Sequence, residues 1–116
     1  MNGVTAIEEF EVELEKLRDK LLELGVKKIV VAVKDEVKYK FPADLEADET
    51  VNRVRALIGI LGAPGPALFV KPSSEIFYVY VGEDSLVVLV GDLDEGLGEE
   101  YSLIAKLLIN EVLSRG

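Results

Sequence analysis

Residue types that commonly carry chemistry are sparse in this chain. The 116 residues include no cysteine and no histidine. Histidine is the commonest general base and zinc ligand, and cysteine supplies thiolate nucleophiles and disulfides. An enzyme built from this chain would depend on aspartate, glutamate, lysine or tyrosine. No pair of these stands at the spacing of a catalytic motif, and Asp92 and Asp94 are adequately explained as loop residues before a helix. The sequence therefore predicts no catalytic residue, no cofactor and no enzymatic activity.

An acidic loop is the best candidate for a metal site. Residues 42–48 read PADLEAD, and the carboxylates of this region belong to Asp44, Glu46, Asp48 and Glu49. The spacing lacks the glycine and the terminal glutamate of an EF-hand loop. Negative charge before a helix also complements the helix dipole. We interpret the segment as a solvated loop that leads into a helix, and predict no metal site.

Two other segments resemble ligand sites. Residues 62–66 read GAPGP, but no Gly-Lys-Ser/Thr follows and the prolines remove backbone donors, so phosphate binding is not predicted. Tyr78 and Tyr80 share one face of a predicted strand, and Phe77 lies on the other face. Either face could line a pocket between a sheet and its helices, through Tyr78 and Tyr80 or through Phe77, although tyrosine is also common in sheets because of its β propensity. A small-molecule pocket stays open as an alternative.

Charge and hydropathy restrict the classes of partner. Thirteen basic and 22 acidic residues give a net charge of −9, which disfavours nucleic acid and anionic membranes. The apolar runs are much shorter than a membrane helix, and no signal peptide pattern is present. We expect a cytoplasmic protein without direct membrane insertion. The absence of cysteine and glutamine, with abundant charged residues, also suits a thermophile.

Apolar periodicity predicts three helices, at residues 5–24, about 50–61 and 99–114. The first has a capping box at Thr5 and a C-terminal stop at Gly25. Its apolar stripe repeats every three or four residues and consists of Ile7, Phe10, Leu14, Leu17, Leu21 and Leu24. The second helix is apolar nearly all round in its second half, which predicts burial on more than one side.

Alternating and continuous apolar runs predict five strands, at residues 28–33, 36–41, 67–71, 75–81 and 85–90. The first and last are apolar on both faces, which predicts central positions. The second is predicted to be an edge strand, with Val37, Tyr39 and Phe41 on one face and charged residues on the other.

These elements predict an α+β fold with three α/β/α layers. The element order is α-β-β-α-β-β-β-α, in one domain that spans residues 1–116. Both 2-1-5-4-3 and 2-1-3-4-5 keep sequential strands adjacent in a mostly antiparallel sheet. We favour 2-1-5-4-3, because it places the two most apolar strands in the centre. Two long helices should cover one face, and the short helix the other.

The second helix and the third strand predict a dimer. The strand forms an exposed edge with no charge before Lys71, and such an edge is a pairing site for another chain. In so small a domain, a second covering surface for the helix most simply comes from another subunit. The predicted interface residues are Val54, Leu57, Ile58, Leu61, Leu68, Phe69 and Val70.

The chain resembles the Roadblock / dynein light-chain family over nearly its whole length. The likeness is carried by LRDKLLELGVKKIVVAV, VNRVRALIGILG, EIFYVYVGEDSLVVLVGD and a closing helix. The first hairpin departs from the family, whose members usually turn with Asp-x-Asp-Gly where this chain has Lys34-Asp35-Glu36. The resemblance implies a homodimer that acts as a non-catalytic regulator or scaffold. Members of this family bind Ras-like small GTPases, or motor and membrane-signalling proteins. The alternative is a profilin- or PAS-like small-molecule sensor.

Overall fold

The computed structural model describes the chain at residues 3–61, 67–71 and 74–115, with side chains described at 13–60, 69–71 and 74–114. The helices and strands follow one another in the predicted order, and a short 3-10 turn precedes the last helix. The elements are α1 (Gly3–Glu23), β1 (Val26–Val33), β2 (Glu36–Phe41), α2 (Ala47–Leu61), β3 (Ala67–Val70), β4 (Ile76–Val81), β5 (Ser85–Gly91), η1 (Glu95–Leu97) and α3 (Gly98–Arg115).

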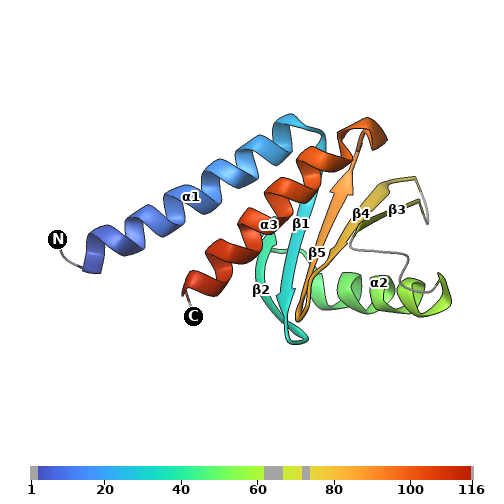
Figure 1. Cartoon of the computed structure of the whole chain (residues 1–116), viewed down its shortest axis with the longest axis horizontal. Helices are drawn as coiled ribbons and strands as arrows, with labels where there is room; N and C mark the ends of the chain where they lie inside the picture. Colours follow the sequence, from blue (N-terminus) through green and yellow to red (C-terminus); the bar gives the residue numbers. More distant parts are fainter. Residues whose placement is uncertain (1–2, 62–66, 72–73, 116) are drawn as a thin grey trace.

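The five strands form one sheet in the predicted order β2-β1-β5-β4-β3. Every neighbouring pair is antiparallel. Helices α1 and α3 lie side by side over one face, and α2 covers the other (Figure 1). The predicted three-layer α+β architecture is confirmed. Among the described residues, no helix is both long enough and apolar enough to cross a membrane.

Two apolar layers hold the sheet between its helices. On β1, Ile29 and Val31 pack toward α1 and α3, whereas Val30 and Ala32 pack toward α2. Strand β5 divides its side chains in the same way. Because burial of one such side chain contributes roughly 1.5–3 kcal/mol, strands with two apolar faces are most stable in the centre of the sheet. This is the physical reason that the predicted strand order is correct.

The hydroxyl of Tyr101 links the end of α1 to the loop before α3. This side chain is completely buried. Its hydroxyl donates to the carbonyl of Leu24 at 2.9 Å and accepts from the amide of Asp94 at 3.1 Å. Both backbone groups are therefore satisfied by a side chain where helix and strand hydrogen bonds end.

One predicted face assignment is wrong. The pairing register of β1 and β2 shifts between Val31 and Ala32, which is the signature of a β-bulge. Val37 packs in the layer under α2, whereas Tyr39 and Phe41 pack on the side of α1 and α3. An extra residue in one strand sends the side chains beyond it to the opposite face. The alternating sequence of residues 36–41 gives no sign of this bulge.

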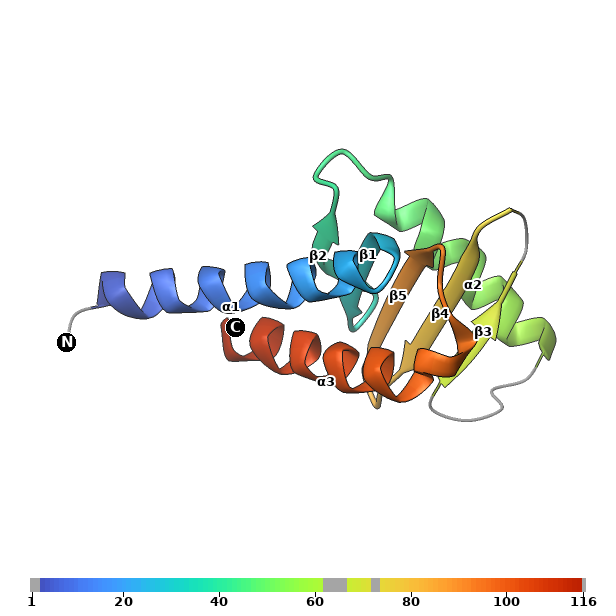
Figure 2. The ribbon, with the colours of Figure 1, turned by 90° about the horizontal axis from the view of Figure 1, so that it is seen from above.

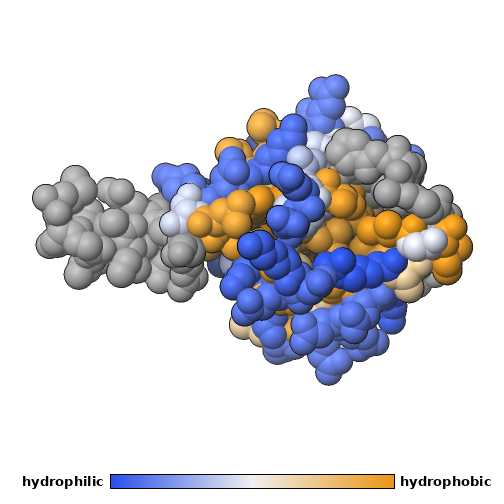
Figure 3. Space-filling view, turned by 60° about the horizontal axis from the view of Figure 1, so that its bottom comes forward, coloured by the Kyte–Doolittle hydropathy of each residue, from blue (hydrophilic) through white to orange (hydrophobic). Residues whose placement is uncertain are grey.

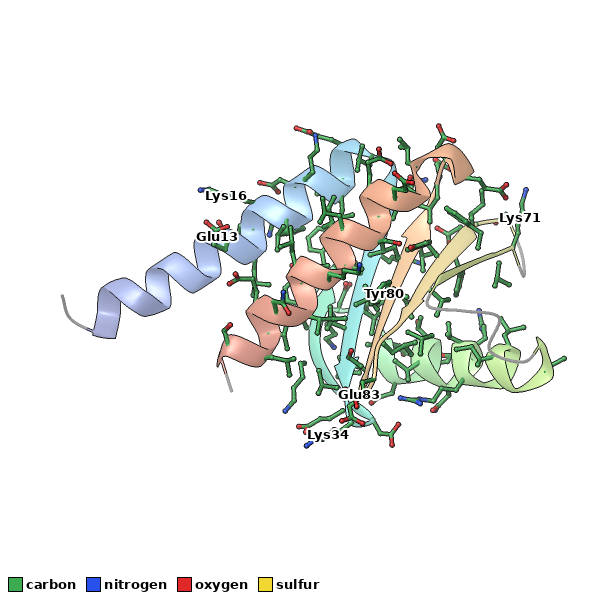
Figure 4. The ribbon with its side chains drawn as sticks, in the orientation of Figure 1. Glu13, Lys16, Lys34, Lys71, Tyr80 and Glu83 are labelled. Atoms are coloured by element: carbon green, nitrogen blue, oxygen red, sulfur yellow. The ribbon has the colours of Figure 1, made fainter. Side chains whose placement is uncertain are left out.

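The chain reverses at Lys34 and Asp35, as predicted. Both residues have left-handed backbone conformations, with φ of 51° and 66°. A two-residue hairpin turn needs this geometry to match the strand twist, and asparagine or glycine usually supplies it. The Lys34 amide donates to the carbonyl of Asp84 at 2.8 Å, so this turn lies beside the β4–β5 turn, where Glu83 is found (Figure 4).

Replacing Lys34 with asparagine is expected to stabilise the fold by about 0.5–1 kcal/mol, because asparagine tolerates the left-handed region at lower cost. Urea unfolding at neutral pH measures the change. Lys71→Asn is the matched control, since it removes the same charge at an exposed residue without a positive φ. Equal effects of the two substitutions would rule out relief of backbone strain.

Candidate protein-binding surface

The predicted interface residues on α2 differ in burial. Val54 is only 1% exposed and packs against the sheet, so within one chain it anchors α2 rather than facing outward. Leu57 and Ile58 are half-buried. Ile60, which the predicted set omits, is 80% exposed. It is the most exposed of the large apolar side chains that the structure describes. The side chain of Leu61 lies outside the described residues.

The outer surface of α2 changes character along its length. In the part of α2 up to Arg55, Arg53 pairs with Glu49 at 3.5 Å and Arg55 pairs with Asp35 at 2.7 Å. From Ala56 to the end of the helix at Leu61, the sequence carries no charge. Figure 3 shows hydrophobic side chains at the end of the molecule where α2 ends, and further hydrophobic side chains among hydrophilic ones across the middle of that view. The charged side chains of the part up to Arg55 are suited to contact with water, whereas the last turns of α2 expose apolar side chains.

Strand β3 continues this region along the edge of the sheet. It pairs with β4, and no other described strand lies along its outer edge. Val70 packs toward α2, whereas the ring of Phe69 lies on the opposite face, 4.9 Å from the ring of Tyr78. Both residues are half-buried. The side chain of Leu68 lies outside the described residues.

We call this region the α2–β3 surface, and define it by Leu57, Ile58, Ile60, Phe69 and Val70. It combines apolar side chains with an edge strand whose backbone groups face outward on one side. Exposed apolar side chains can mark a protein interface, and an edge strand without a described neighbour on one side favours pairing with another strand. Ile58 and Val70 pack against the same layer under α2, whereas Phe69 lies on the opposite face of the edge strand. Ile60 is the residue of this set that the sequence pattern did not select.

The residues predicted for a small-molecule pocket lie on opposite faces of the sheet, as the alternation of β4 predicted. Phe77 is buried on the α2 face. Tyr78 is buried on the opposite face, where its hydroxyl bonds to the hydroxyl of Ser102 and lies 3.4 Å from the carbonyl of Gly98. A hollow of about 530 Å³ lies at the surface between β3 and α3, and is lined by Phe69, Tyr78, Gly98, Glu99, Ser102, Leu103 and Lys106. The Tyr78 hydroxyl is therefore already satisfied within the chain.

The acidic residues considered as metal ligands or catalytic groups have structural roles. Asp48 and Glu49 lie in the first turn of α2, where their charge stabilises the helix dipole. Asp94 accepts a hydrogen bond from the amide of Gly96 at 2.8 Å, and Asp92 pairs with Lys27 at 3.2 Å. Within the described residues, no group of three or more potential ligands could hold a metal ion. The glycine- and proline-rich residues 62–66 lie outside the described residues.

Burial raises the pKa of two tyrosines above the usual value of 10. At Tyr78 desolvation is the main cause, with an opposing contribution from the Ser102 hydrogen bond and a small reinforcing one from Tyr80. At Tyr39 desolvation again dominates, the Arg18 guanidinium opposes it, and the Glu15 and Asp19 carboxylates reinforce it. The folded chain therefore holds these two protons more tightly than the unfolded chain does.

Stability is expected to be complete below about pH 10 and to fall as the pH rises through the raised pKa values of the folded state, because the unfolded chain then loses its protons first. Urea unfolding at pH 8, 9, 10 and 11 measures this decline. The double variant Tyr39→Phe/Tyr78→Phe should decline less steeply. An unchanged slope in that variant would show that other groups govern alkaline unfolding.

Comparison with known proteins identifies the fold. No protein-family model and no curated protein matches the sequence. Among solved structures, one described as MglB with tetrameric arrangement shares 23% identity over 90% of each chain, with a TM-score of 0.65. The gliding protein MglB of Thermus thermophilus shares 22% identity over 92% of each chain, with a TM-score of 0.63. A Roadblock/LC7 domain from Streptomyces avermitilis shares 19% identity over 77% of this chain and 87% of that chain, with a TM-score of 0.55. The Roadblock fold predicted from the sequence is confirmed.

Proposed function

We propose that this chain is a single Roadblock-like domain that acts in the cytoplasm as a non-catalytic homodimeric regulator or scaffold for a Ras-like small GTPase. The observation that carries the proposal is the α2–β3 surface. It combines Ile60, the most exposed of the large apolar side chains described, on a helix end without charge, with a sheet edge along which no other described strand lies.

The dimer follows from the self-complementarity of this surface. Two β3 strands that pair antiparallel about a two-fold axis would continue the sheet from one chain into the other. Helix α2 lies on one face of the same sheet, so the same axis would bring the two α2 ends together. Ile60 and Leu57 would then lose their contact with water. Homodimer interfaces are more apolar than the rest of a protein surface, which agrees with the composition of this one.

A small GTPase as partner follows from the resemblance and the fold. The Roadblock / dynein light-chain resemblance implies binding to Ras-like small GTPases, and the matched MglB and Roadblock/LC7 structures support the same fold for this chain. In such a dimer the exposed Arg53 and Arg55 side chains would lie on one continuous outer surface with their copies. That surface exists in neither chain alone, so binding of the partner is expected to depend on dimer formation.

Calorimetric titration tests the partner. Ras-like small GTPases from the same organism are loaded with GDP or with a non-hydrolysable GTP analogue and titrated into the chain. The expected result is at least a tenfold difference in Kd between the two nucleotide states for one of these GTPases. A Kd that is independent of nucleotide, or the absence of binding to all of them, would overturn the GTPase assignment.

A further inference from the structure

Helix α1 extends farther than the layer in which it packs. It has 21 residues, and therefore a length of about 31 Å at 1.5 Å per residue. Figure 2 shows that its N-terminal part continues beyond the C-terminal end of α3 and away from the sheet. The molecule is accordingly elongated, with extents of 48, 28 and 26 Å. We call the part of α1 before Leu14 the α1 arm (residues 3–13).

The apolar stripe of α1 continues from the packed part of the helix into the arm. Leu14 and Leu21 are buried against α3 and the sheet, and Leu17 packs beside them. In the sequence, Ile7 and Phe10 repeat at the same spacing toward the N-terminus. An isolated helix of fewer than about 12 residues is marginal in water, and most helical stability comes from packing of an apolar face. The arm therefore has the pattern of a helix that gains stability from a second helix.

The charge of the α1 arm indicates which kind of second helix it would bind. The sequence has no lysine or arginine before Lys16, and its five glutamates up to that point are Glu8, Glu9, Glu11, Glu13 and Glu15. Two of them border the stripe, since Glu11 follows Phe10 and Glu13 precedes Leu14. Residues that border an apolar seam decide the partner of a helix through charge pairing. Glu13 is exposed on α1, and Figure 4 shows it with Lys16 on the outer side of the helix.

We propose that the α1 arm is a docking element for a partner helix whose apolar stripe is bordered by lysine or arginine. A second copy of the arm is disfavoured because its four glutamates would meet four others. An anionic lipid surface is disfavoured for the same reason. This docking element is separate from the α2–β3 surface and does not depend on dimer formation.

Two designed 21-residue helical peptides test the proposal by fluorescence anisotropy. Both carry leucine at the seam positions; one has lysine at the bordering positions and the other glutamate. The full chain is expected to bind the lysine peptide at least tenfold more tightly than the glutamate peptide. Phe10→Glu is expected to weaken binding of the lysine peptide at least tenfold, and Glu11→Lys/Glu13→Lys to reverse the preference between the peptides.

Glu83→Lys/Asp84→Lys is the matched control, because it changes the net charge equally on the β4–β5 turn, outside α1. Its affinity for the lysine peptide should stay within twofold of wild type. A loss in this control equal to that in the arm variant would show that binding follows net charge, and would overturn the proposal. So would full affinity in Phe10→Glu. A molar mass in solution that falls on Phe10→Glu in an Ile60→Glu background would instead assign the arm to a second copy.

Discussion

Replacing Gly25 with alanine is expected to destabilise the chain by about 3 kcal/mol and to lower its Tm by on the order of 10 °C. Gly25 ends α1 with a φ of 95°, in the left-handed region where a side chain is strained. A Cβ atom at this residue would lie 2.2 Å from the carbonyl oxygen of Asp92. That contact cannot relax easily, because the Asp92 amide donates to the Gly25 carbonyl at 3.0 Å and holds the two segments together.

The measurement is urea and thermal unfolding followed by circular dichroism. Gly59→Ala is the control, because a Cβ atom at Gly59 would meet nothing within 4 Å. Gly59 lies inside α2, so alanine should raise helix propensity and leave the free energy of unfolding equal or up to about 1 kcal/mol higher. A loss of less than about 1 kcal/mol in Gly25→Ala would contradict the close approach of α1 and the end of β5.

Replacing Ile60 with glutamate is expected to raise the Kd of the proposed dimer at least 100-fold. A charge buried at the centre of an apolar interface without a partner is strongly unfavourable. Ile60 is preferable to Leu57 or Val54 for this test. Val54 belongs to the core and Leu57 is half-buried within its own chain, so a charge at either residue also perturbs the fold. At 80% exposure, Ile60→Glu should leave the unfolding free energy of the single chain nearly unchanged.

Light scattering across a dilution series measures the molar mass against the chain mass of 12.7 kDa. Wild type is expected at twice this mass at micromolar concentration, and Ile60→Glu at the chain mass. Leu113→Glu is the matched control, since Leu113 is 54% exposed on α3, on the other face of the sheet. A monomeric wild type, or a dimer that survives Ile60→Glu but not Leu113→Glu, would place self-association elsewhere.

Much of the fold was predictable from local apolar patterns. The helices and the alternating strands have apolar repeats, and the continuous apolar runs are short and bounded by turn residues, so the boundaries follow from the sequence to within three residues. The two-sided apolar character of β1 and β5 was enough to choose the correct strand order. The positive φ at Gly25 followed from the end of the stripe at Leu24. In all of these cases the relevant interactions join residues near in sequence, or depend on one strand having two apolar faces.

The candidate surface was only partly predictable, because exposure depends on which face of a helix meets the sheet. A helix that is apolar nearly all round does not reveal its contact face, so the sequence grouped Val54 with Leu57 and omitted Ile60. Spacing could have separated them, since Ala47, Val51 and Val54 form the buried row. This signal was obscured by the apolar residues that follow Ala56.

The sequence by itself determined the elements, their layers and their order, since these follow from where apolar area must be buried. Only the tertiary structure decided the bulge between β1 and β2, the approach of Gly25 to Asp92, the bridge made by Tyr101, and the extension of α1 beyond α3. The last three depend on contacts between segments that are distant in sequence or on the relative lengths of packed elements, and the bulge depends on a pairing register that the alternating sequence of residues 36–41 does not reveal. A local sequence pattern shows which side chains of a segment must be buried, but not which residues of other segments they contact.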